Sequence, residues 1–206
     1  MRTRTLAGVS IALLALTIQT VAQQATTAPS AQQDREKAVA YLEETRAKFL
    51  KSIDGLSEAQ WKFKAGPDRW SIAEVAEHIA ISEGTILGLI QQKMLAMPAP
   101  KPDEKVADEK VIESLLDRTS KFQAPEMLKP VNKWATKEAL VKDFNAARDQ
   151  TIQFIKTTPE DLRAHAAPHP VLKTLDTHQW VLLIGGHSAR HTLQIEEVKT
   201  AAGYPK

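Results

Sequence analysis

Apolar residues recur at helical spacing in four long segments of this sequence, and this periodicity constrains the fold more than any other feature. The segments cover residues 34–53, 71–96, 136–158 and 176–203. No run of alternating apolar and β-branched residues predicts a sheet, and no internal repeat is visible. We therefore expect an all-α fold, a four-helix bundle in which four amphipathic helices enclose one core.

The second helix has the clearest predicted start. The Ser71 hydroxyl can accept a hydrogen bond from the Glu74 amide, and the Glu74 carboxylate can reach back to the Ser71 amide, as in a capping box. Met97-Pro98 ends this helix. Residues 98–132 then form a long crossover to the third helix, with one helical piece near residues 111–116.

The first residues have the three parts of a bacterial-type signal peptide. Arg2 and Arg4 precede an uncharged apolar run of about 16 residues, and the small-residue sequence Thr20-Val21-Ala22 follows it. The run falls short of the roughly 20 residues that span a bilayer, which disfavours the alternative of a membrane anchor. We expect a signal peptide over residues 1–22, a disordered spacer over 23–33 and the bundle domain over 34–206. The mature protein is then periplasmic or secreted, with no stable membrane anchor after cleavage.

The composition of the chain limits its partners and its chemistry. Without Arg2 and Arg4 the 27 basic residues fall to 25, equal in number to the acidic ones. A neutral chain gives no reason to expect nucleic acid or an anionic membrane as partner. The chain has no cysteine, which excludes disulfides, thiolate ligands and a cysteine nucleophile. Metal ligands must therefore come from His, Asp or Glu.

Two histidines in the fourth helix suggest a metal site. His187 and His191 lie one turn apart, in the apolar sector that includes Ile184 and Ile195. Two buried imidazoles are costly unless they are paired, and a shared metal ion resolves that cost. The alternative is two core histidines, each hydrogen-bonded to a carbonyl or a carboxylate.

His78, two turns into the second helix, favours the metal. Two facing helices would then supply three nitrogens and leave a fourth position open, as in catalytic zinc sites. Nickel, iron or copper suits the same ligands. The other three histidines are expected elsewhere: His165 and His169 in a proline-containing loop over residues 159–175, and His178 exposed in the first turn of the fourth helix. The sequence HSARH lacks the glutamate of zinc proteases, which disfavours peptidase activity.

Residues next to the histidine pair leave alternatives open. Gly185 and Gly186 are unfavourable in a helix, so their bare backbone serves either a ligand's approach or close helix packing. Arg190 and Gln194 flank His191. They would orient the ligands, contact a bound molecule, or play a purely structural part.

The segments 66–78 (GPDRWSIAEVAEH) and 187–197 (HSARHTLQIEE) resemble the DinB-like (YfiT-like) superfamily of metal-binding four-helix bundles. The resemblance implies an up-down-down-up bundle and a divalent transition metal, commonly Zn or Ni, on His78, His187 and His191. It also implies frequent homodimers. Some members are transferases or isomerases that use low-molecular-weight thiols in the cytoplasm. The expected export departs from that setting, so we do not extend thiol use to this chain.

Three functions compete at this point. The first is a metal-dependent enzyme of hydrolase or transferase type acting on an unknown small molecule, and no general base can be assigned from spacing. The second is a non-catalytic metal- or ligand-binding protein related to stress. The third is a structural bundle with satisfied core histidines.

Overall fold

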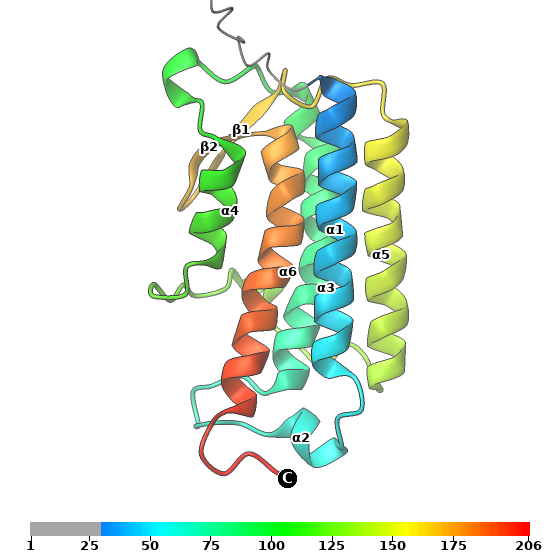
Figure 1. Cartoon of the computed structure of the whole chain (residues 1–206), viewed down its shortest axis with the longest axis vertical. Coiled ribbons are helices and arrows are strands. Elements are labelled where there is room, and N and C mark those ends of the chain that lie inside the picture. The colour runs from blue at the N-terminus through cyan, green and yellow to red at the C-terminus, as the bar shows by residue number, and fades with distance from the viewer. Residues whose placement is uncertain (1–29) are drawn as a thin grey trace, which may run out of the picture.

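The computed structural model describes residues 30–206, so the expected signal peptide and residues 23–29 of the expected spacer lie outside the described part. Four long helices form the body of the molecule (Figure 1). They are α1 (Ala31–Ile53), α3 (Ile72–Gln92), α5 (Lys137–Thr157) and α6 (Thr177–Lys199). The shorter elements are α2 (Glu58–Lys62), η1 (Met94–Ala96), η2 (Pro102–Glu104), α4 (Asp108–Leu116), η3 (Glu126–Leu128), β1 (Ala166–His169) and β2 (Lys173–Asp176).

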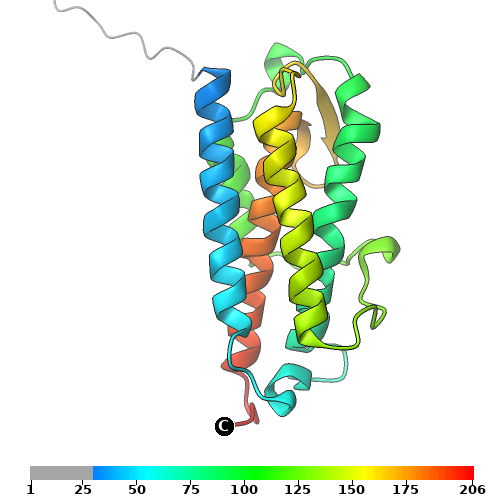
Figure 2. The same ribbon diagram turned by 90° about the vertical axis from the view of Figure 1, so that its right-hand side faces the viewer.

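The helix directions follow the expected up-down-down-up order. Helices α1 and α6 run one way along the bundle, and α3 and α5 run the other way (Figures 1 and 2). Helix α1 packs against α5 and α6, and α3 packs against the same two helices. The long crossover between α3 and α5 carries α4, which lies outside the bundle against α6. The predicted four-helix bundle is thus confirmed. None of the helices in residues 30–206 is both long and apolar enough to cross a membrane.

Capping boxes fix the starts of three long helices. Ser71 and Glu74 form the predicted reciprocal bonds at the start of α3, of 2.7 and 3.2 Å. Ser30 caps α1 in the same way, so this helix begins three residues before the expected Asp34, inside the expected spacer. Helix α3 ends at Gln92, short of the expected residue 96, and the turn η1 follows it.

Part of the segment 159–175, expected as a loop, is an antiparallel hairpin, so the prediction of no sheet was wrong here. Strands β1 and β2 pair with Ala166 opposite Asp176 and His169 opposite Lys173. Each strand has only four residues, too few to show an alternating pattern. Pro168 lacks an amide hydrogen and is usually excluded from strand interiors, but an isolated hairpin consists of edge strands, which tolerate it.

The core consists of two apolar layers separated by a polar layer. Leu42 on α1 and Ile184 on α6 belong to one apolar layer, and Phe49 and Ile195, further along the same helices, belong to the other. The polar layer contains Thr45, Glu83, Arg148 and Ser188, one residue from each long helix. Arg148 donates to Glu83, Thr45, Ser188 and the Leu42 carbonyl. This layer joins all four helices at one level of the bundle.

The two glycines of α6 serve close packing. A Cβ atom on Gly186 would lie 2.6 Å from Cδ1 of Leu115 in α4. A Cβ atom on Gly185 would lie 3.0 Å from the Tyr41 ring in α1. Of the two readings left open by the sequence, the structure therefore supports helix packing.

Candidate metal centre

Helices α3 and α6 bring the three predicted ligands together. The ring centroids of His78, His187 and His191 lie 4.5 to 4.8 Å from one another. The Nε2 atoms of His78 and His187 are 3.0 Å apart. One nitrogen from each ring lies within 4.8 Å of the others, so the three side chains could hold one metal ion.

Hydrogen bonds on the outer side of two rings set their tautomers. Nδ1 of His78 lies 2.7 Å from the Leu128 carbonyl, and Nδ1 of His191 lies 2.8 Å from Oε1 of Gln194. Both oxygens only accept, so each Nδ1 carries the proton and each Nε2 keeps its lone pair for a metal. Among the described residues His187 bonds only to His78, through Nε2, and its Nδ1 has no partner. No contact therefore fixes the His187 tautomer, and its proton can reside on Nδ1 when Nε2 binds a metal.

Burial keeps the three rings neutral. It lowers the pKa of His78 against the opposing effect of the bond to Leu128. Burial, followed by the charges of His191 and His78, lowers the pKa of His187 well below its usual value. Burial and then the charge of His78 lower the pKa of His191 to about 3. Neutral imidazoles with converging lone pairs are the donor set that a divalent transition metal requires, so these residues fit such an ion.

The three histidines differ in exposure. His78 is buried, and the Trp70 ring packs against it at 5.0 Å between centroids. His187 and His191 are partly exposed. A metal held by the three rings would keep a fourth coordination position that no protein ligand fills.

Gln194 and Arg190 have different roles. Gln194 contacts His191 directly and is placed to orient its ring. The Arg190 guanidinium turns away toward the crossover, where it donates to the carbonyls of Leu115 and Ser120 at 3.0 and 2.6 Å. Arg190 thus holds the crossover against α6. Its positive charge also helps to lower the pKa of His191.

The other three histidines have different contacts, although the charge of His169 still contributes to the lowered pKa of His187. His165 bonds through Nδ1 to the Met97 carbonyl at 2.8 Å, and His169 packs on the Trp180 ring. His178 is only 2% exposed, so its predicted exposure was wrong. The crossover covers it, because Asp108 of α4 lies 3.5 Å from its Nε2 atom.

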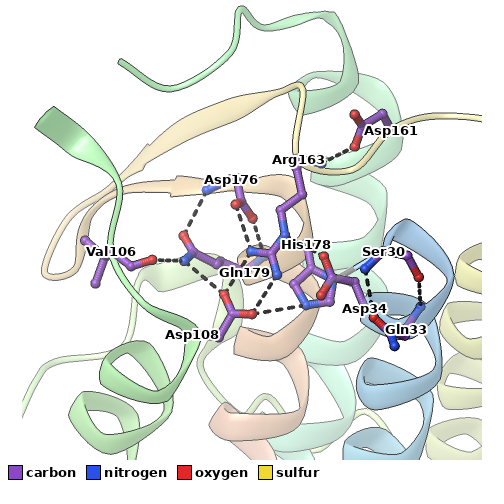
Figure 3. A network of polar contacts seen from close by, with 10 residues as sticks. All are labelled: Ser30, Gln33, Asp34, Val106, Asp108, Asp161, Arg163, Asp176, His178 and Gln179. Carbon is purple, nitrogen blue, oxygen red and sulfur yellow. Dashed lines mark hydrogen bonds and ion pairs between the residues drawn. The ribbon is translucent and has the colours of Figure 1, made fainter. Parts of the chain in front are cut away.

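A second group of ligand-type residues lies at the start of α6 (Figure 3). Asp34, Asp108 and His178 bring their side-chain atoms within 4.8 Å of one another. The Arg163 guanidinium already occupies the space among the carboxylates, at 2.9 Å from Asp34, 2.7 Å from Asp108 and 3.0 Å from Asp176. Although burial opposes ionisation, the bonds from Arg163 and His178 hold the pKa of Asp108 well below its usual range. We interpret this cluster as a clamp that ties the start of α1, α4 and the hairpin to α6.

The sequence predicted neither this clamp nor the hydrogen bond between the Leu128 carbonyl and His78. The clamp residues are scattered from position 34 to position 178, with no spacing that relates them. A backbone carbonyl carries no side-chain signal at all.

Comparisons with known proteins agree with this geometry. Residues 41–195 match the DinB superfamily, a span that contains all three histidines and Gln194. The uncharacterized protein YuaE of Bacillus subtilis is 28% identical over 156 residues, which cover 76% of this chain and 93% of YuaE. YfiT from Bacillus subtilis, described as a probable metal-dependent hydrolase with an unusual four-helix bundle topology, has a similar fold. The TM-score is 0.55 at 18% identity, covering 88% of this chain and 94% of YfiT. With its bundle, its histidines and this match over most of its length, the chain belongs to the DinB superfamily.

Proposed function

We propose that this chain is a metal-dependent enzyme of hydrolase or transferase type that acts on a small molecule. One observation carries the proposal: three imidazoles whose pKa is lowered by burial converge from α3 and α6, where one metal ion could bind all of them. The likeness to YfiT supports the hydrolase class. We expect Zn or Ni on His78, His187 and His191.

The chain's own residues would prepare this site. Leu128 and Gln194 hold two ligands in the tautomer that points Nε2 inward. A divalent ion bound there supplies Lewis-acid chemistry, which lowers the pKa of a coordinated water or thiol and makes a nucleophile near neutral pH. The charges of Arg118 and Arg190 help to lower the pKa of His191, but both side chains are engaged elsewhere, because Arg118 pairs with Glu197 and Arg190 donates to carbonyls of the crossover.

The three glutamates of α3 are all engaged elsewhere. Glu74 closes the capping box and pairs with Lys64. Glu77 accepts three backbone hydrogen bonds from the crossover. Glu83 pairs with Arg148 in the polar layer. This lack of a free carboxylate on α3 favours the second candidate function, a non-catalytic metal- or ligand-binding protein, or else a reaction in which the activated nucleophile needs no separate base.

The setting of the activity is also part of the proposal. The signal-peptide pattern over residues 1–22 supports export to the periplasm or the medium. Family resemblance supports a homodimer. The neutral charge of the expected mature chain disfavours nucleic acid as a partner.

The test compares metal-free protein with protein reloaded with Zn, Ni or Co on a panel of chromogenic esters, phosphoesters and thiol-transfer substrates. The His187→Ala variant should lose both metal and turnover, and the His169→Ala variant should keep both. Turnover that is independent of metal, or retained in His187→Ala, would refute the proposal. Stoichiometric metal without turnover on any of these substrates would favour the non-catalytic binding protein.

A further inference from the structure

The carboxylate of Glu77 accepts three hydrogen bonds, all of them from backbone amides at the end of the crossover. Its Oε1 accepts from the amides of Val131 and Lys133 at 2.8 and 2.9 Å, and its Oε2 accepts from the Asn132 amide at 3.1 Å. Glu77 is only 6% exposed, so its carboxylate lies within the protein and depends on these three amides for its hydrogen bonds. Asn132 adopts a left-handed backbone conformation (φ 58°), which helps three consecutive amides to face one carboxylate.

Apolar packing does little to hold this part of the crossover. Met127 and Val131 are 67% and 70% exposed, and every residue of η3 lacks full burial. The ion pair between Lys129 and Glu126 lies on the surface, where such pairs contribute little. The position of residues 126–133 against α3 therefore depends mainly on polar contacts.

The same segment orients a metal ligand. The Leu128 carbonyl, three residues before Val131, accepts a hydrogen bond from His78 Nδ1 at 2.7 Å. His78 follows Glu77 directly in α3. Two consecutive residues of α3 thus contact the same short segment. Glu77 holds the segment in place, and the segment in turn orients the His78 ring.

We propose that Glu77 is a positioning residue of the metal centre, which holds the crossover so that the Leu128 carbonyl fixes His78 in its metal-binding tautomer. This inference rests on the proposed function in so far as it concerns metal affinity. Loss of an outer partner of a ligating histidine commonly lowers metal affinity about 10- to 100-fold. We expect a loss of this size when Glu77 no longer holds the segment, even though Glu77 does not touch the metal.

The test uses Glu77→Gln, which keeps the size of the side chain but replaces one accepting oxygen by an NH₂ group that cannot accept. The matched control is Glu74→Gln, one turn earlier on α3, where glutamine can still close the capping box. Zn and Co affinity is measured by competition with a chelator. Tryptic cleavage after Lys133 reports the anchoring of the segment. Nitrogen NMR of metal-free protein reports the His78 tautomer.

We expect Glu77→Gln to bind metal 10- to 100-fold more weakly, to be cut faster after Lys133 and to show mixed His78 tautomers, while Glu74→Gln matches the wild type in all three. A segment that is cut faster while metal affinity and tautomer stay unchanged would overturn the inference, as would unchanged cleavage. If wild-type protein binds no metal, the proposed function fails. The tautomer comparison in metal-free protein then still decides about Glu77. If Glu77→Gln does not fold, Glu77→Asp, which keeps the charge but shortens its reach, should show the same three changes.

Discussion

The buried guanidinium of Arg148 offers a direct test of how the polar layer holds the four helices together. Arg148 and Glu83 are 0% and 2% exposed. The Arg148→Met change removes all five hydrogen bonds of the guanidinium and leaves the Glu83 carboxylate in the core with only the Ser188 hydroxyl, at 2.8 Å. Breaking one side of a buried ion pair costs about 3–5 kcal/mol. That is a large share of the roughly 5–15 kcal/mol that stabilises a typical domain.

The assay is urea unfolding followed by far-ultraviolet circular dichroism. Arg148→Met should lower the free energy of unfolding by about 3–5 kcal/mol, and the double change Arg148→Met/Glu83→Leu should recover most of it, because no unpaired charge remains. The control is Arg46→Met, since Arg46 pairs with Glu43 and Asp149 at the surface and should cost less than about 1 kcal/mol. A loss in Arg148→Met no larger than in Arg46→Met, or a double variant worse than the single one, would refute the reasoning.

Three further predictions concern the ligands and the helix contacts. Gln194→Leu removes the hydrogen-bond acceptor of His191 Nδ1, so chelator competition should show a metal affinity at least about tenfold lower. An unchanged affinity would contradict the role of Gln194 in orienting His191. The unfolded chain takes up a proton on His191 near pH 6.5, but the folded ring does so only near pH 3, so metal-free protein should lose stability steadily as the pH falls from about 6.5 toward 3. A urea midpoint that stays flat over that range would contradict the lowered pKa of His191. A Cβ atom on Gly84 of α3 meets nothing within 4 Å, so Gly84→Ala should raise the free energy of unfolding by up to about 1 kcal/mol. Gly186→Ala must displace Leu115 and should lower the free energy of unfolding by about 1–3 kcal/mol. Thermal unfolding in which Gly186→Ala is the more stable of the two would refute the packing argument.

The parts of this structure that depend on local periodicity could be predicted from the sequence. The helical stripes gave the four long helices, the Ser71–Glu74 spacing gave the start of α3, and the four-residue spacing of His187 and His191 placed both rings on one face. Choosing His78 as their partner needed only that α3 and α6 face each other.

The parts that depend on contacts distant in sequence could not be predicted. The burial of His178 follows from contacts with Asp108 of the crossover and with the Leu162 carbonyl, which lies in the segment before the hairpin. The tautomer of His78 depends on a backbone carbonyl fifty residues away. The early start of α1 depends on Ser30 and Gln33, whose surroundings in the sequence looked like spacer.

Metal content measured by elemental mass spectrometry tests the central claim most directly. Untagged wild-type protein and the double variant His78→Ala/His191→Ala would be purified from the native compartment in parallel. We predict close to one equivalent of a transition metal in the wild type and none in the variant. No metal in either protein, or equal metal in both, would contradict a metal centre built on these three histidines.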